Sequence, residues 1–374
     1  MDPQGSFTPP PAPGARVGLP KPPPGWRPPP NMPPPGMNPY PPYRQGGSWA
    51  SRIFLTLATT IFGLSLALNV YLILLSGILN NSKPRVTTIE DGDVTEKVAV
   101  IPLTGAIFDG TARNFDRFMD DVEKDTAVKA IVIEIDSPGG TVTASDQIHH
   151  RLEDFKLKFP DKPVIIAMGG LAASGGYYVA CAGDHIFAQR TTMTGSIGVL
   201  WQSMNVSRLL DKWGVEDNSI HSTGADYKEV GSPTKPMSAE ESQYIRAIID
   251  QAFSEFKQVV VGGRKSALKQ PIDTIANGKI YTAQEALSLG LVDAIGYLSN
   301  ATQHAAGVAK LKNPMVVRYE PAPSLLLMLG LGSQSPIDGG GASVSNSKGL
   351  TINVSADLLR DMTQSRMMYM WNGR

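Results

Sequence analysis

The sequence is poor in cysteine and has no surplus of charge of either sign. Its 374 residues include one cysteine, Cys181, so no intramolecular disulfide can form. Basic and acidic residues number 34 each, and no long run of one sign occurs. This balance excludes the basic footprint of a nucleic-acid-binding protein. Cys181 lies among small apolar residues and is expected to pack as an inert buried thiol.

Signatures of phosphate binding are absent as well. The sequence has no GxGxxG motif, and no glycine-rich loop continues into Gly-Lys-Ser or Gly-Lys-Thr. Nucleotide binding is therefore not expected. Neither a cofactor nor a metal site is predicted.

Residues 1–50 contain 18 of the chain's 30 prolines. A segment of this composition cannot bury enough apolar surface to offset the cost of ordering it. We expect a disordered tail with polyproline II character, which acts either as a spacer or as a docking site for an unknown binding protein.

No charged residue occurs from residue 53 to residue 79. A helix of this length spans a hydrocarbon core of about 30 Å, so a retained transmembrane helix is predicted. Local charge counts do not decide its orientation, because Lys and Arg flank both ends. The surplus of basic residues in the tail favours a cytoplasmic N-terminus. A polar linker is expected over residues 80–96.

Strand-like and helix-like segments alternate from residue 97 to residue 320, which predicts an α/β domain with a mainly parallel sheet. Apolar runs such as 98–103, 130–135 and 163–168 indicate strands, and amphipathic or small-residue stretches between them indicate helices. Residues 321–374 turn to Gly and Ser and predict a flexible C-terminal extension.

One serine stands among unusually small neighbours in GGLAASGGYYVA, which begins at Gly169. A preceding strand and a following helix would place Ser174 in the first helical turn, after a turn at Gly169–Leu171. Free N–H groups there favour developing negative charge, as a nucleophile attacking a carbonyl requires. Tight packing of a strand against a helix explains the small residues equally well, so this stretch alone leaves both readings open.

A second loop, DSPGG, follows the strand at 130–135 and ends at Gly140. It lies at the carboxyl edge of the predicted sheet, where α/β proteins bind ligands. Exposed N–H groups in such a turn suit an oxyanion hole, each donor being worth about 3–4 kcal/mol in acyl transfer.

A nucleophilic serine needs a base. None of the five histidines lies in a setting with an evident carboxylate partner, so a histidine triad is disfavoured. Lys228 in STGADYKEVGSP is the alternative, but a lysine acts as a base only where burial lowers its pKa. From the residues alone, a solvated loop lysine fits Lys228 as well.

Four motifs together resemble the SppA-type signal peptide peptidases, peptidase family S49, in the Clp protease/crotonase superfamily. They are DSPGG, GLAASGGYYVA, TGSIGV at 194–199 and YKEVGSP at 227–233, and the likeness covers about residues 95–310. The resemblance implies a Clp protease/crotonase-like α/β fold in the short form of the family, with one catalytic unit.

The resemblance also implies residue roles. Ser174 would be the nucleophile and Lys228 the general base, with Ser196 orienting the lysine. The N–H groups of Gly140 and Gly175 would form the oxyanion hole, with Gly139 as the alternative to Gly140. Small residues around Ser174 predict a small, apolar substrate side chain beside the nucleophile.

The resemblance further implies a homo-octameric ring in which neighbouring protomers contribute the serine and the lysine. The chain would sit in the inner (cytoplasmic) membrane as a single-pass protein, with its catalytic domain on the outer side, degrading remnant signal peptides. Two other classes stay open: a crotonase-type acyl-CoA enzyme, and a non-catalytic membrane scaffold that uses the proline tail.

Overall fold

The computed structural model describes residues 24–25, 27, 49–80, 84–321 and 366–371. The expected proline-rich tail, apart from residues 24–25, 27 and 49–50, and residues 322–365 of the expected extension lie outside the described residues. The chain divides into two compact units, residues 1–74 and 75–374. The first unit holds most of helix α1 (Trp49–Asn80), whose stretch Arg52–Leu72 is long and apolar enough to cross a membrane.

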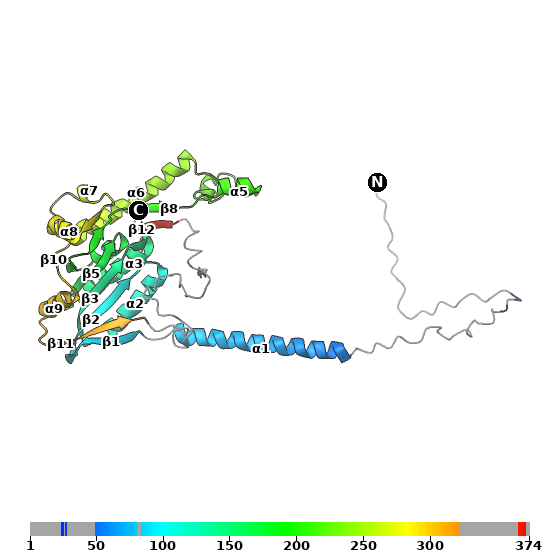
Figure 1. Ribbon diagram of the computed structural model, residues 1–374, viewed down its shortest axis with the longest axis horizontal. Coiled ribbons are helices and arrows are strands. Elements are labelled where there is room, and N and C mark those ends of the chain that lie inside the picture. The colour runs from blue at the N-terminus through cyan, green and yellow to red at the C-terminus, as the bar shows by residue number, and fades with distance from the viewer. Residues whose placement is uncertain (1–23, 26, 28–48, 81–83, 322–365, 372–374) are drawn as a thin grey trace, which may run out of the picture. The chain divides into compact units, whose positions relative to one another are not determined.

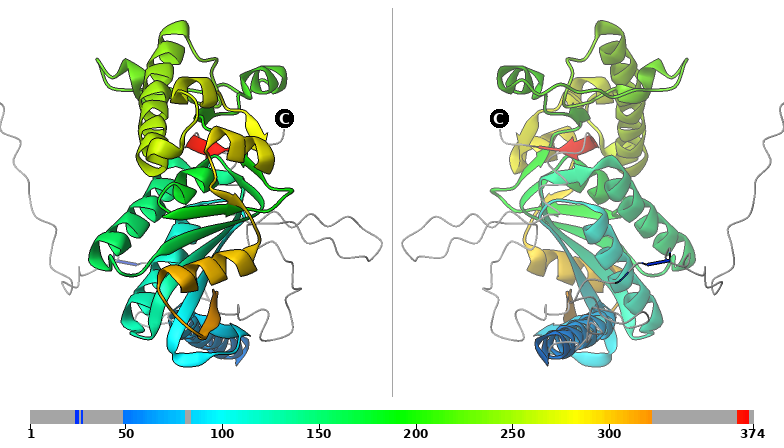
Figure 2. Two further views of the ribbon diagram at one scale, coloured as in Figure 1. Left: turned by 90° about the vertical axis from the view of Figure 1, so that its left-hand side faces the viewer. Right: turned by 90° about the vertical axis from the view of Figure 1, so that its right-hand side faces the viewer.

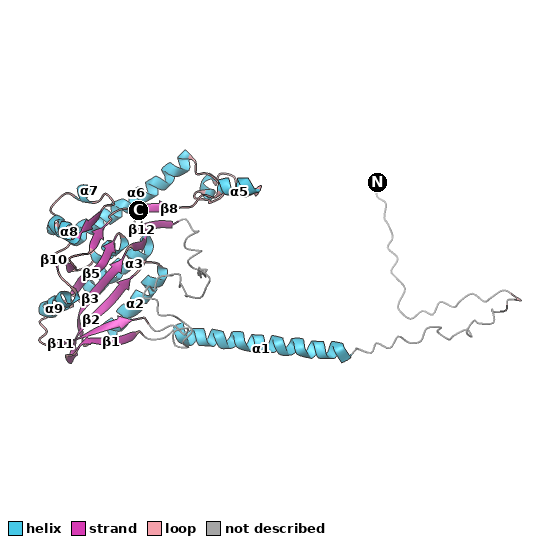
Figure 3. Ribbon diagram, in the orientation of Figure 1, coloured by secondary structure: helices cyan, strands magenta, loops and turns pink. Residues whose placement is uncertain are grey.

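The second unit alternates strands and helices, as the sequence predicts (Figures 1 and 3). Its strands are β1 Arg85–Glu90, β2 Asp93–Thr104, β3 Val128–Ser137, β4 Gly139–Thr141, β5 Val164–Ala173, β6 His185–Ala188, β7 Met193–Gly195, β8 Leu200–Gln202, β9 Ile280–Thr282, β10 Ala294–Ile295, β11 Pro314–Glu320 and β12 Arg366–Met370. Its α-helices are α2 Asp109–Lys124, α3 Val142–Lys158, α4 Gly175–Ala180, α5 Ser207–Trp213, α6 Ala239–Arg264, α7 Ile272–Ile275, α8 Ala283–Leu289 and α9 Leu298–Val308, with 3-10 helices η1 Asp226–Glu229 and η2 Lys265–Ala267.

The larger sheet has the strand order β1-β11-β2-β3-β5-β6-β10. Every pairing in this order from β11 to β10 is parallel, whereas the edge strand β1 runs antiparallel to β11. β7 pairs in parallel with the carboxyl end of β5. On its other side, β7 pairs with β9 in antiparallel fashion. A smaller sheet has the order β4-β12-β8. The prediction of a Clp protease-like α/β fold is confirmed.

Alternate residues of the central strands face opposite layers, so two cores form. On one side, Ile101 and Ile133 belong to a large core shared with α2, α3 and α4. On the other, Val100 and Val132 pack with Ala301 of α9. Figure 2 shows α9 on one face of the sheet and α2 and α3 on the other. Because both faces are covered, the strands are apolar throughout rather than alternating with polar residues.

The structure differs from the expected elements in three places. The polar stretch at 80–96 contains the strand β1. The turn predicted at Gly169–Leu171 is wrong, because β5 continues through these residues to Ala173 and Ser174 itself makes the turn. Part of the expected flexible extension is ordered as β12, which pairs with β4 and β8. The four apolar residues that follow Arg366 in β12 give no sequence signal of their distant pairing partners.

Candidate active site

Ser174 lies at the junction between β5 and α4 in an unusual backbone conformation. Its φ is 54° and its ψ is −114°, a region that residues with a Cβ rarely adopt. Such a conformation costs on the order of 1–3 kcal/mol and persists only where the surroundings impose it. Here the Ser174 N–H donates to the Gly195 carbonyl oxygen at 2.8 Å, and its own carbonyl accepts from the Tyr178 N–H at 2.8 Å. The side chain makes no capping hydrogen bond, and the residue is 1% exposed.

Ser196 occupies the matching position on the neighbouring strand. β5 and β7 run parallel with Ala173 opposite Gly195, so Ser174 and Ser196 are the next residues of two paired strands. Ser196 also has a positive φ, 50°, and its N–H donates to the Lys279 carbonyl at 2.7 Å. Both serines are buried. The structure therefore brings together two of the sequence-predicted site residues.

The predicted oxyanion glycines also lie side by side. A Cβ built on Gly175 would be 3.1 Å from the Gly140 nitrogen and would collide with the Ser145 hydroxyl. Gly139 has a φ of 95°, and its N–H donates to the Ser137 hydroxyl at 3.1 Å. The Gly139 N–H is therefore already bonded within its own turn.

Lys228, in contrast to this buried group, is exposed. It belongs to η1, which has no buried residue, and its side chain is exposed. A lysine acting on the 1%-exposed Ser174 within the same chain would itself be covered. The stretch from Ser203 to Ser238 that carries η1 also includes α5, which projects beyond the sheet in Figure 1. We call this stretch the arm.

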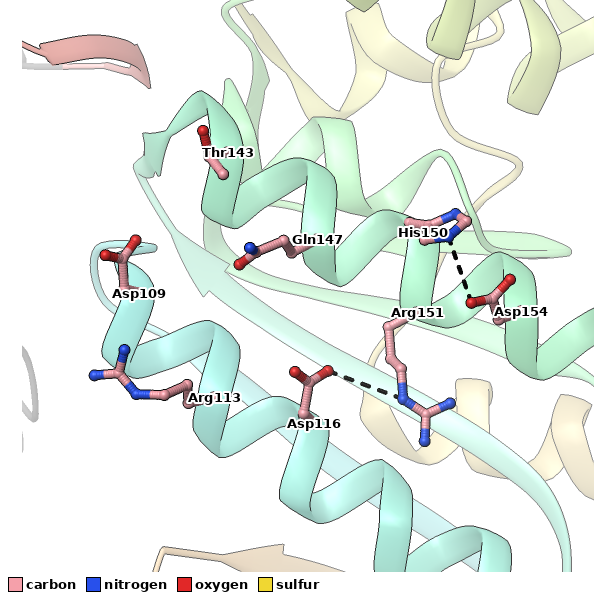
Figure 4. Close-up of a pocket in the computed structure, with 8 residues that line it drawn as sticks. All are labelled: Asp109, Arg113, Asp116, Thr143, Gln147, His150, Arg151 and Asp154. Atoms are coloured by element: carbon pink, nitrogen blue, oxygen red, sulfur yellow. Dashed lines mark ion pairs between the residues drawn. The ribbon is translucent and has the colours of Figure 1, made fainter.

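His150 lies in a surface groove whose lining does not include Ser174. Figure 4 shows His150 in an open groove between α2 and α3, 3.5 Å from Asp154. The groove is lined by surface ion pairs and includes none of the sequence-predicted site residues. Among the residues that the structure describes, no cluster of three His, Cys, Asp or Glu side chains could hold a metal ion. Burial raises the pKa of Cys181 to about 12, so this thiol stays protonated and unreactive.

A strained, buried serine beside two paired amide groups is the arrangement of a serine acyl-transfer site. Comparison with known sequences agrees with it. The model of Peptidase family S49 matches residues 156–312, and that of Clp protease matches residues 84–212. A protein named as a protease in Synechocystis is 37% identical over 242 residues, which cover 64% of this chain and 85% of that one. The chain belongs to peptidase family S49.

Two further relatives are similar to this S49 serine peptidase over part of its length. A protein named as signal peptide peptidase SppA in Enterococcus faecium is 34% identical over 247 residues, covering 62% of this chain and 70% of that one. A protein named as a protease in Methanocaldococcus jannaschii is 35% identical over 208 residues, covering 56% of this chain and 65% of that one.

Some residues of the site went unnoticed in the sequence. Ser137 and Ser145 are both fully buried and hold the glycine turn: the Ser145 hydroxyl donates to the Thr141 carbonyl at 2.9 Å. Tyr178 follows Ser174 by one helical turn, and its ring stacks on that of Tyr369 in β12 of the smaller sheet. Serine at the second position of DSPGG was a usable signal, because short polar side chains bond their own backbone two residues on.

Proposed function

We propose that this S49 peptidase is a membrane-anchored endopeptidase whose nucleophile is Ser174 and whose general base is Lys228 of a neighbouring copy. One observation carries the proposal: Ser174 is held in a strained conformation beside Ser196 and the paired glycines, whereas Lys228 is exposed on the arm. Each chain thus has a serine site that lacks only its base, and it exposes a lysine away from that site. Two neighbouring copies would complete each other's sites.

In the proposed mechanism, Lys228 removes the proton of the Ser174 hydroxyl as its oxygen attacks the scissile carbonyl carbon. The oxyanion accepts hydrogen bonds from the N–H groups of Gly140 and Gly175. Lys228 then returns the proton to the leaving amine, and water hydrolyses the acyl-enzyme by the same route. Ser196 accepts or donates a hydrogen bond that orients the lysine. Docking against a partner would desolvate Lys228 and so favour its neutral, basic form.

The arm supports assembly through its unpartnered apolar side chains. Trp213 is 73% exposed and Ile220 is 96% exposed, and Met204, Leu209 and Val215 are exposed as well. All five lie in one stretch of 17 residues, and exposed apolar surface that is contiguous marks protein interaction sites. A second copy of this chain is the partner that supplies the missing half of each site, and closed rings are the usual outcome of such head-to-tail contacts. We propose a homo-octamer.

The name of the Enterococcus faecium relative supports the substrate class, and the length and composition of α1 support a membrane location. We propose that the chain degrades remnant signal peptides, from a single-pass anchor at α1 in the cytoplasmic membrane, with its N-terminus in the cytoplasm and its catalytic unit outside. The apolar stretch Arg52–Leu72 supports the anchor.

The test uses the full-length chain in detergent and an apolar fluorogenic peptide. Ser174→Ala and Lys228→Ala should each lower kcat by roughly 10⁴-fold or more, as loss of a nucleophile or base does. Ser203→Ala and Lys212→Ala are matched controls, since both residues are exposed on the arm. Full activity of either dyad variant would refute the dyad, and inactivity of every chain would favour a scaffold.

A further inference from the structure

The segment that carries Lys228 is short and lies between two glycine turns. η1 has four residues, and Gly224 and Gly231 on either side of it have positive φ values of 80° and 78°. Its backbone is held locally by bonds such as that from the Lys228 N–H to the Ala225 carbonyl, 2.9 Å long. A single short 3-10 turn has poor hydrogen-bond geometry and does not fix the direction of a lysine side chain by itself. Contacts with the rest of the chain must therefore hold this segment.

An ion-pair bridge holds the residue after Lys228. Glu229 Oε2 lies 3.1 Å from Lys235 Nζ, and Glu241 Oε1 lies 3.0 Å from the same Nζ. Lys235 thus joins the residue beside the proposed base to the first turn of the 26-residue helix α6. The two carboxylate side chains are 23% and 10% exposed, so water and salt screen this bridge only in part.

The α6 end of this bridge is fixed by the cap of the helix. Glu241 Oε2 accepts a hydrogen bond from the Ser238 N–H at 2.8 Å, and the Glu241 N–H donates to the Ser238 hydroxyl at 3.1 Å. The bonds from the Ser238 N–H and from Lys235 lower the pKa of Glu241 below its usual value. In turn, Glu241 and Glu229 raise the pKa of Lys235. Both Lys235 and Glu241 therefore stay charged at neutral pH.

A ring contact holds the residue before Lys228. The Tyr227 ring lies 4.9 Å from the Tyr244 ring of α6, at an angle of 44° between the planes. Tilted aromatic rings at this separation attract one another. η1 is thus attached to α6 on both sides of Lys228.

The Lys228 side chain itself takes part in neither contact. It is exposed, and among the residues that the structure describes its ammonium has no ion-pair partner. Besides the two tyrosines, the titratable groups around η1 are Asp226 and Glu229 on η1 itself, Asp211, Glu216, Asp217 and Lys235 elsewhere on the arm, and Glu241 on α6. A free carboxylate next to a lysine favours the charged form, which cannot act as a base. Pairing with Lys235 compensates the charge of Glu229.

We propose that Lys235 is a positioning residue for the general base Lys228: it holds η1 on α6 and neutralises the Glu229 carboxylate beside the base. The proposal rests on the proposed peptidase function and deepens its lysine half. Neither role requires Lys235 to touch the substrate, so its two effects are separable by experiment.

The pH dependence of kcat/KM tests the electrostatic role. The assay uses the full-length chain in detergent and an apolar fluorogenic peptide, and the acid limb of the profile reports protonation of the essential base. Lys235→Met leaves Glu229 without this partner, and the surplus negative charge favours the protonated lysine. The limb should move to higher pH by roughly one unit, the effect of one charge about 10 Å away at an effective dielectric constant of about 20.

Removal of the opposite charge should have the opposite effect. Glu229→Gln takes away a negative charge, so the acid limb should move to lower pH. The double variant of Lys235→Met and Glu229→Gln loses one charge of each sign, and its limb should return close to the wild-type position. A purely structural role of the bridge would not produce shifts of opposite direction.

The value of kcat at the optimum pH tests the positioning role. Lys235→Met should lower kcat about tenfold or more, because the base is held less well, and the double variant should keep this loss. Lys235→Arg should preserve both ion pairs and the wild-type profile. Lys257→Met is the matched control, since it removes a lysine 2.8 Å from Asp273 about four turns further along α6. It should leave both kcat and the acid limb unchanged.

Three results would overturn the proposal. The first is a wild-type kcat and acid limb in Lys235→Met, and the second is a limb that stays shifted in the double variant, since another charge would then be responsible. The third is a smaller assembly of Lys235→Met in analytical ultracentrifugation, because the bridge would then act on docking of the arm rather than on the base.

Failure of the peptidase proposal gives a different pattern. If no chain cleaves the peptide, or if Lys228→Ala cleaves it at the wild-type rate, the proposed dyad fails and this proposal with it. If the wild-type chain is active, Lys228→Ala is inactive and Lys235→Met matches the wild type, only the role of Lys235 is refuted.

Discussion

Ser174 and Lys228 lie in regions of opposite character. Around Ser174, two parallel strands, a positive-φ turn and a glycine pair leave almost nothing exposed. Around Lys228, the 3-10 helix has no buried residue, and neighbouring apolar side chains such as Trp213 face solvent. The first region is complete within one chain, whereas the second presents surface that a partner would cover. The comparison separates what folding of one chain provides from what the proposed assembly would add.

Mixing two inactive variants tests most directly whether the serine and the lysine of one site come from different chains. Ser174→Ala and Lys228→Ala alone should each lose roughly 10⁴-fold in kcat. Co-assembled in equal amounts, they should recover about a quarter of wild-type activity, since in a random ring one site in four joins an intact serine to an intact lysine. The measurement is peptide cleavage after dissociation and joint reassembly. No recovery in verified mixed oligomers would place both residues of the dyad in one chain.

Gly175→Ala tests the packing of the serine half. The new Cβ would collide with the Ser145 hydroxyl, so the turn must shift and the Gly175 N–H with it. We expect kcat to fall roughly 10²–10³-fold, as loss of an oxyanion donor does.

Two further variants sharpen this test. Ser145→Gly removes the colliding hydroxyl, so the double variant should regain much of the lost kcat. Gly198→Ala is the control, because its Cβ would meet only ordinary contacts at 3.5 Å and beyond. An equal loss of activity in Gly198→Ala would show that the loops tolerate no added methyl group at all.

Trp213→Asp tests the arm. The side chain is 73% exposed in the isolated chain, so a charge there should not affect the fold of the protomer. Within an assembly interface it would be buried without a partner, and we expect a shift to smaller species and a loss of activity of about tenfold or more. Analytical ultracentrifugation in detergent reports the first effect and peptide cleavage the second. Unchanged assembly would exclude Trp213 from the interface.

The sequence predicted the α/β alternation well, because apolar runs that form strands are a local pattern. It predicted the turn near Ser174 less well, since it placed that turn at Gly169–Leu171, whereas β5 continues to Ala173. It could not predict the approach of Gly140 to Gly175, which depends on how β4 meets α4. It could not predict the pairing of β12 either, since a strand of five residues does not specify partners more than 160 residues away. Long-range register is decided by tertiary packing rather than by local preference.

The smallest expected effect concerns pH and contrasts two adjacent histidines on α3. His149 is half-buried, with its ring 5.2 Å from that of Tyr178, whereas His150 is exposed. Burial lowers the pKa of His149 below its usual value. In the unfolded chain this histidine titrates near a pKa of about 6.5.

The sign of the effect follows from which state binds the proton more tightly. Below a pH of about 6.5 the unfolded chain takes up a proton that folded His149 resists, so stability falls as the pH decreases. His149→Gln removes this linkage and should flatten the decline in thermal midpoint of the full-length chain between about pH 6.5 and pH 5. His150→Gln, the exposed control, should keep the slope. If both variants flatten the decline equally, burial beside Tyr178 is not its cause, and the acid sensitivity of this helix arises from its surface charge.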